Sequence, residues 1–290
     1  MKEFRNAKEL LLLCEEKALP ISEIMRRREI IIGEMPEQEV DSRMTRVLEI
    51  MKEAAFSPLE HPVKSMGGLI GGESKKLFQH QTSGKGICGD LLEKAITYAM
   101  ATLETNASMG LIVASPTAGS AGIVPGLLLA LQKVYNFSDA QIQKSLFNAG
   151  AIGYLAMRNA TVAGAVGGCQ AETGIAAAMA ASAATELMGG TPVQCTYAAS
   201  TVLMNMLGLV CDPVGGLVEY PCQNRNAAGV ANALVAAEMA LSGITQLIPL
   251  DEMIATMYTV GKKMPAELRE TALGGCAIAP SACEACHMCS

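Results

Sequence analysis

The chain has 290 residues, enough for a large buried core in one or two domains. Its net charge is −6 and its basic run is limited to Arg26, Arg27 and Arg28, which argues against a nucleic-acid-binding surface. Half of the residues are hydrophobic but only 4% are aromatic, so Ala, Leu, Met, Val and Ile must fill the core.

The N-terminal stretch "MKEFRNAKELLLLCEEK" has charges on both sides of a short apolar run, which is typical of an amphipathic helix and not of an export signal. Residues 38–55 carry apolar side chains at helical spacing. The first 55 residues are more charged than the rest. We therefore expect residues 1–55 to form an outer helical layer of the same domain.

The most apolar stretch, residues 109–134, is interrupted by Pro116, Pro125 and several glycines. Proline breaks the backbone hydrogen-bond pattern of a helix, so this stretch predicts a buried helix pair and no membrane span. Glycine-rich connections, among them "SMGGLIGGESKK" and "SPTAGSAG", lie between the predicted helices. In a helical protein, such loops are where backbone amides meet a ligand.

The later segments also predict helices. Ser138 is expected to cap one helix, with Gln141 three residues later. Thr191 and Pro192 have the residue types of an N-cap and a first helical position. An Ala-rich helix over 172–190 and helices over 226–243 and 250–264 complete the pattern. We predict an all-α, multi-layer domain in which glycine-rich loops converge on a metal-cluster site, with a core over 56–280 and a flexible cysteine-rich tail over 281–290.

Ten cysteines without an export signal indicate a reducing cytoplasm, where cysteines are packing residues or metal ligands. Cys14 and Cys195 lie within helical stretches and are interpreted as packing residues. Cys169, Cys211 and Cys222 lie in turn-rich stretches beside Gly or Pro, where we expect accessible thiols with thiolate favoured at helix N-termini. Three thiolates would leave one metal position open, as a Lewis acid requires. From the spacing alone, a metal site and ordinary buried loop cysteines are equal alternatives for these three residues.

Five motifs carry a resemblance to a known family: "GGCQAETG", "LGLVCDPVGGLVEYPCQNRNA", "ASPTAGSAGIVPG", "NASMG" and "MPAELRETALGG". The chain resembles the α chain of bacterial iron–sulfur L-serine dehydratases from "FRNAKEL" to about residue 280. The resemblance implies a [4Fe–4S] cluster held by Cys169, Cys211 and Cys222, with a fourth iron free for substrate. It implies deamination of L-serine to pyruvate and ammonia without pyridoxal phosphate. It also implies a separate β chain, and therefore a hetero-oligomer.

The substrate carboxylate needs hydrogen-bond donors, which the glycine-rich loops offer at helix N-termini. An ordinary tight turn is the alternative for each loop. Serine, threonine and cysteine remain open as preferred substrates. We predict these substrate-binding residues: Ser65, Gly67, Gly68, Asn106, Thr117, Gly119 and Ser120.

The general base is left unassigned among Lys76, Lys85, His61 and His80, each of which also fits an ordinary surface or loop residue. A β chain is a further source of the base. Polar residues also lie within a few positions of the three cysteines. They are Glu172, Asp212, Asn224, Arg225 and Asn226.

Arg225 is expected to offset the negative charge of a cluster. Asn224 or Asn226 would by default cap the helix that follows.

The tail "CEACHMCS" contains Cys283, Cys286, His287 and Cys289. We predict Cys289 as a fourth ligand that caps the open iron when serine is absent, because a thiolate on a chain end has a high local concentration. The alternative is a tail that binds stray metal or nothing. Two other functions also stay open: a cysteine desulfidase with the same cluster, and an iron–sulfur electron-transfer protein that uses the tail cysteines.

Overall fold

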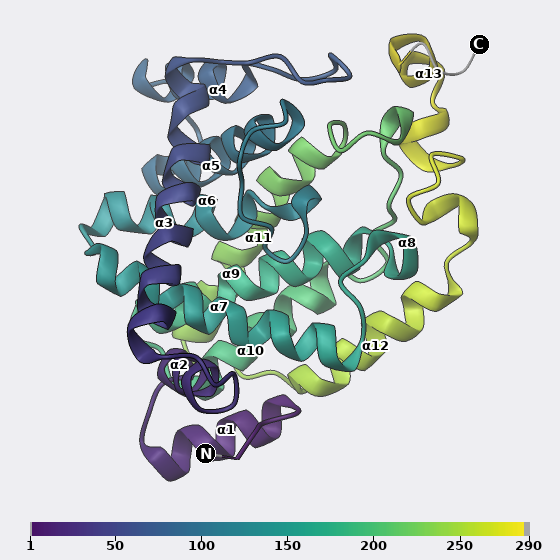
Figure 1. The fold of residues 1–290 in the computed structure, drawn as a ribbon. Coiled ribbons are helices and arrows are strands. Elements are labelled where there is room, and N and C mark those ends of the chain that lie inside the picture. Colours follow the sequence, from purple (N-terminus) through teal and green to yellow (C-terminus); the bar gives the residue numbers. More distant parts are fainter. Residues whose placement is uncertain (1, 287–290) are drawn as a thin grey trace.

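The computed structural model describes residues 2–286, and those residues form an all-α fold without a β-strand (Figure 1). The predicted fold class is confirmed. The α-helices are α1 (Ala7–Lys17), α2 (Ile21–Ile31), α3 (Glu37–Glu60), α4 (Glu73–Thr82), α5 (Gly89–Ala107), α6 (Ile123–Tyr135), α7 (Asp139–Asn159), α8 (Gly164–Gly167), α9 (Ile175–Leu187), α10 (Pro192–Asn205), α11 (Cys222–Leu241), α12 (Leu250–Lys263) and α13 (Pro280–Cys286).

The helix ends follow local sequence signals. Ser138 and Gln141 form a reciprocal capping box at the start of α7, as predicted. Thr191 and Gln194 form a second box at the start of α10, with Pro192 in the first turn. In both boxes a side-chain oxygen accepts a backbone N–H that the first helical turn leaves unpaired.

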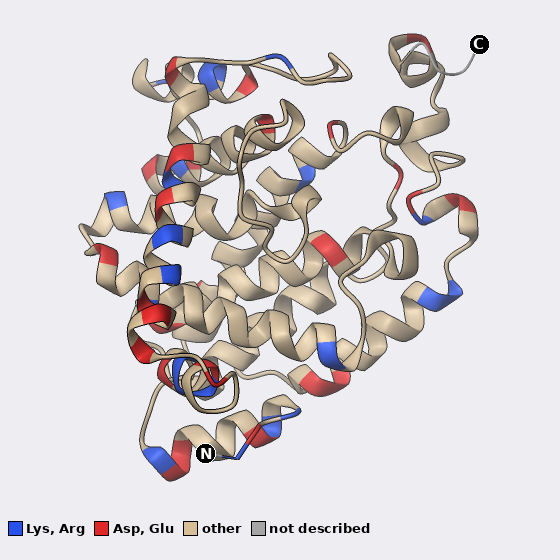
Figure 2. Cartoon of the chain, in the orientation of Figure 1, with Lys and Arg blue, Asp and Glu red and all other residues tan. Residues whose placement is uncertain are grey.

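Helix α9 lies at the centre of the molecule, where all residues from Ile175 to Thr185 are buried. It packs against α6, α7, α10 and α11, while α3 runs along one side of the stack (Figure 1). Charged side chains gather on α1, α2, α3 and α4, and α9 is nearly free of them (Figure 2). This distribution matches helices that are apolar on all sides and therefore lie within the body.

Small residues bring the helices together. A Cβ atom placed on Gly126 of α6 would lie 2.8 Å from the Cβ of Ala99 in α5. The two helices are therefore close enough that only glycine fits at this position. Side chains of the N-terminal segment, including Phe4, Leu10 and Ile21, belong to the same buried apolar cluster as α9.

Two expectations about helices were wrong in detail. Residues 109–134 do not form a helix pair, because residues 110–114 have no regular structure and only α6 is helical, apart from a 3₁₀ turn at Ala118–Ser120. Pro116 follows a cis peptide bond and lies in this irregular part. Helix α11 begins at Cys222, four residues before the predicted start at Asn226. Among residues 2–286, the helices all fall short of the length or apolarity needed to cross a membrane.

Candidate functional site

Three separate segments carry Cys169, Cys211 and Cys222. Cys169 precedes a π-helical turn, Gln170–Gly174, that leads into α9. Cys211 lies in an extended stretch and forms an isolated β-bridge with Arg269. Cys222 is the first residue of α11. The thiols are near enough for Cys169 and Cys222 to raise the pKa of Cys211, so the fold brings the three together.

The three thiols are not the accessible thiolates that their loop context led us to expect. Cys169 and Cys211 are both buried. Burial raises the pKa of Cys169 and Cys211, and it raises the pKa of Cys222 to about 12. Neighbouring thiols and Glu172 add to the increase for Cys211 and Cys222. Desolvation therefore outweighs the helix N-terminus, which favours a thiolate.

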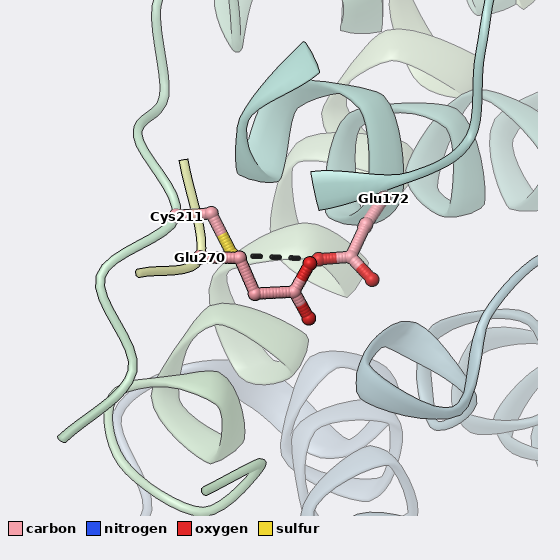
Figure 3. A group of neighbouring side chains, drawn as sticks. All are labelled: Glu172, Cys211 and Glu270. Atoms are coloured by element: carbon pink, nitrogen blue, oxygen red, sulfur yellow. Dashed lines mark hydrogen bonds between the residues drawn. The ribbon is translucent and has the colours of Figure 1, made fainter. Parts of the chain in front are cut away.

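Two carboxylates face Cys211 (Figure 3). The Cys211 Sγ lies 3.6 Å from the Glu172 Oε2, and one donor atom from each of Cys211, Glu172 and Glu270 lies within 4.8 Å of the others. Burial raises the pKa of Glu172, while a hydrogen bond from Thr117 acts in the opposite direction. The Thr117 loop, predicted to bind substrate, therefore reaches the cysteine site through Glu172.

Glu270 is held in place by its backbone. Its φ of 64° lies in the left-handed region, which is uncommon for a residue other than glycine. Its N–H donates to the Cys211 carbonyl oxygen at 2.7 Å. The exposed carboxylate of Glu270 and the partly buried carboxylate of Glu172 therefore both lie beside Cys211.

Gly164 is a site residue that the sequence analysis missed. A Cβ atom placed there would lie 2.5 Å from the Glu172 Oε2 and 2.9 Å from the Cys211 Sγ. No larger residue fits without displacing one of these groups. A glycine in a four-residue helix carries no sequence signal for such a contact, so only the tertiary structure reveals it.

The Thr117 loop keeps its hydroxyl groups close together. The Thr117 Oγ1 and the Ser120 Oγ are 3.1 Å apart. A Cβ atom placed on Gly119 would lie 3.7 Å from the Glu172 Oε1. This loop therefore places the Thr117 hydroxyl and the small residue Gly119 beside Glu172. Ser120 is fully buried behind Thr117.

The other glycine-rich loop that we predicted to bind substrate, "SMGGLIGGESKK", instead binds a carboxylate of the chain itself. The Glu219 carboxylate accepts hydrogen bonds from the Ser65 hydroxyl at 2.6 Å and from the N–H groups of Gly67 and Leu69 at 2.6 Å and 3.0 Å. Gly68 adopts a φ of +77°, which turns the loop around this carboxylate. Asn106 is half-buried at the end of α5, where its backbone carbonyl accepts from the Met109 N–H at 3.0 Å.

The four candidate bases lie elsewhere. His61 is exposed and 4.0 Å from Glu60, and Lys76 lies 3.7 Å from Glu73. Lys85 and His80 are also exposed. Among residues 2–286, none of the four makes a hydrogen bond or an ion pair with the three cysteines. Their assignment as bases stays a prediction.

The described part of the tail packs beside the site. Helix α13 contacts the turn Val214–Gly216, and the Cys276 N–H donates to Asp212 at 2.6 Å. The Cys283 Sγ lies 3.8 Å from the Ala277 carbonyl oxygen. His287 and the predicted cap Cys289 lie outside the described residues, so the capping role stays a prediction.

The first turn of α11 contacts the segment that carries Cys211 through Arg225. The Arg225 guanidinium pairs with Asp212 at 2.7 Å and donates to the Val210 carbonyl at 2.9 Å. It also lowers the pKa of Cys222, against the larger opposing effect of burial.

Asn226 lies inside α11, so the expectation that it caps the helix was wrong. Its side chain instead binds the backbone of the Thr117 loop.

Comparison with known proteins places this geometry in a family. A family model described as "Serine dehydratase alpha chain" matches residues 16–277. The "Probable L-serine dehydratase, alpha chain" of Bacillus subtilis is 49% identical over 96% of this chain and 92% of its own length. The "L-serine dehydratase, alpha chain" of Peptoniphilus asaccharolyticus is 44% identical over 94% of this chain and 93% of its own.

Other relatives are longer. The "L-serine dehydratase" of Helicobacter pylori strain 26695 is 38% identical over 95% of this chain, which spans 61% of that relative. Escherichia coli "L-serine dehydratase TdcG" is 36% identical, and the chain spans 62% of it. With most of its length matched by the family model and by relatives of similar size, this chain belongs to the serine dehydratase alpha chain family.

Proposed function

We propose that the chain is the α chain of an enzyme that dehydrates L-serine to an aminoacrylate, which then hydrolyses to pyruvate and ammonia. The observation that carries the proposal is the convergence of three cysteines on Glu172, which also contacts the Thr117 loop. Cys169 and Cys211 are buried and Cys222 is partly buried. Relatives of similar length bear the name L-serine dehydratase, alpha chain, which supports serine as the substrate.

The donor set fits a [4Fe–4S] cluster with three protein ligands. Cys169 and Cys211 are buried, Cys222 is partly buried, and both Cys169 and Cys222 raise the pKa of Cys211. A Cβ at Gly164 would fill the space beside Cys211. Arg225 supplies a positive charge that favours the thiolates of Cys169 and Cys222. When bound, such a cluster would supply a Lewis acid that polarises the C–O bond of serine.

The chain's own groups would position the substrate. The Thr117–Ser120 loop is the glycine-rich loop best placed for the serine carboxylate, because it lies beside Glu172 whereas the Ser65–Leu69 nest already holds Glu219. Glu172 and Glu270 face the space beside Cys211 (Figure 3). Their negative charge would attract the ammonium group of serine into the same space.

We further propose a separate β chain. This chain matches relatives named alpha chain over 92–93% of their length, and that name indicates a companion β chain. The Helicobacter pylori relative is longer, and the chain spans 61% of it. Apolar side chains near the two loops are exposed, which suits a surface that a partner covers. They are Met66, Met109, Leu111, Leu217 and Tyr220.

The test is anaerobic reconstitution with iron and sulfide, with and without a candidate β chain, followed by pyruvate measurement. We expect pyruvate only when both chains are present. Cys169→Ser should lose the cluster spectrum and the activity, whereas Cys88→Ser, at an exposed cysteine, should keep both. Full activity of the chain alone would contradict the β-chain proposal.

Assays of substrate preference and of redox behaviour distinguish the proposed enzyme from a cysteine desulfidase and from an electron-transfer protein. Sulfide release from L-cysteine with no pyruvate from L-serine would favour a cysteine desulfidase. Reversible redox cycling with neither reaction would favour electron transfer.

A further inference from the structure

Two buried polar side chains flank Cys222 in sequence. Glu219 precedes it by three residues and is 2% exposed, and Asn226 follows it by four residues and is fully buried. Buried polar groups are costly unless they are fully hydrogen-bonded. The partners of each side chain therefore indicate what it does.

Among the residues that the structure describes, the Glu219 side chain binds one loop. All three of its hydrogen bonds come from residues 65–69, through the Ser65 hydroxyl and the N–H groups of Gly67 and Leu69. The Ser65 hydroxyl also accepts from the Ile70 N–H at 3.2 Å. Within residues 2–286, no Lys or Arg forms an ion pair with Glu219. The loop amides and hydroxyl are therefore its neutral partners, as in an anion-binding nest.

Asn226 binds the other loop. Its Nδ2 donates to the Gly119 carbonyl oxygen at 2.8 Å, and its Oδ1 accepts from the Gly122 N–H at 3.0 Å. The same Nδ2 donates to the Cys222 carbonyl oxygen at 2.9 Å. One amide group thus joins the backbone of the Thr117 loop to the residue that carries the Cys222 thiol.

We propose that Glu219 and Asn226 are positioning residues that hold the two glycine-rich loops against Cys222, each loop by a separate set of hydrogen bonds. Glu219 fills the Ser65–Leu69 nest with a carboxylate of the chain. The Thr117–Ser120 loop, held by Asn226, is then the one that receives the substrate carboxylate. This last step rests on the proposed function, whereas the two separate attachments do not.

Hydrogen exchange of the holoprotein tests the attachments without reference to activity. Glu219→Gln keeps one acceptor oxygen but presents an NH₂ group to donors that need an acceptor. In this variant we expect the rate of backbone amide hydrogen exchange to rise at least about tenfold at Gly67 and Leu69, while the amide of Gly122 stays protected. Asn226→Ala should give the reverse pattern. Because each variant serves as the control for the other, general unfolding cannot imitate the result.

A milder variant covers the case in which Glu219→Gln fails to fold. Ser65→Ala removes one of the three donors to Glu219 and leaves α11 unchanged. It should raise exchange at Gly67 and Leu69 more than at Gly122. Equal loosening of both loops in every variant, or no loosening in any, would overturn the proposal.

Serine kinetics of the reconstituted enzyme then test positioning. Asn226→Ala should raise the KM for serine by about tenfold, because its loop receives the carboxylate. Glu219→Gln should lower kcat with the KM changed less than about twofold. If exchange changes selectively but neither kinetic constant moves, the two residues are structural only and the positioning role is wrong. If the unaltered enzyme makes no pyruvate, the proposed function fails while selective exchange still supports the two attachments.

Discussion

The Arg225 guanidinium lies 2.7 Å from the Asp212 carboxylate and joins the segments that carry Cys222 and Cys211. Asp212 is 2% exposed, so its charge has little access to water. Arg225 also donates to the Val210 carbonyl oxygen on the other side of Cys211. One buried ion pair therefore links the segments of two candidate ligands.

Removal of this pair should be costly. Arg225→Ala leaves the Asp212 carboxylate buried without its partner, and we expect a loss of roughly 3–5 kcal/mol in unfolding free energy. Urea unfolding of the metal-free chain measures it. Arg43→Ala breaks the exposed pair with Glu39 and is the matched control, with an expected loss below about 1 kcal/mol. Similar losses for both variants would show that the buried pair has no special role.

Glu104 predicts a pH effect on stability. Its carboxylate is buried and accepts from the Ser74 N–H, the Ser74 hydroxyl and the Gln223 side chain. Burial raises its pKa in the folded state. The folded state therefore binds more protons than the unfolded state above an unfolded pKa of about 4.3, so the contribution of Glu104 to stability falls as pH rises.

Glu104→Gln should remove this contribution, since its amide can accept from both N–H groups through one oxygen and donate to the Ser74 hydroxyl. Urea unfolding at several pH values from 4 to 8 is the measurement. The variant should gain stability relative to the natural chain as pH rises. Glu104→Ala leaves these buried donors without an acceptor and should lower the free energy of unfolding by about 2–3 kcal/mol at pH 5. A pH-independent difference between Glu104→Gln and the natural chain would contradict the prediction.

Gly164→Ala should damage the metal site more than the fold. The added Cβ collides with Glu172 and Cys211, and we expect a loss of about 1–3 kcal/mol together with reduced iron per chain after reconstitution. Gly150→Ala is the control, because a Cβ there meets nothing within 4 Å and α7 favours Ala. Normal iron content in Gly164→Ala would mean that the space beside Cys211 is not needed for the cluster.

The capping box of α7 gives a stability prediction remote from the site. Ser138→Ala removes the acceptor of the Gln141 N–H and should cost about 1 kcal/mol in unfolding free energy. Ser42→Ala, in the exposed part of α3, should change stability by less than about 0.5 kcal/mol. Thermal unfolding of both variants, with iron content unchanged, provides the comparison.

The helices were predictable because helix formation depends on short-range patterns. Ser138 and Thr191 bind backbone groups three residues away, so their caps can be read directly from the chain. The same local reasoning failed at Asn226, where the start of α11 depends on Cys222 and the preceding turn. It also failed for residues 109–117, whose apolar side chains do not form a helix.

The sequence by itself determined the helical class, the capped helix starts and the family-like motifs around Cys169, Cys211 and Cys222. Only the tertiary structure decided which groups meet. Glu219 and Ser65 are 154 positions apart, and the contact of Glu172 with Cys211 spans 39 positions. The raised thiol pKa values were likewise missed, because desolvation depends on how the whole chain encloses a group and not on its neighbours in sequence.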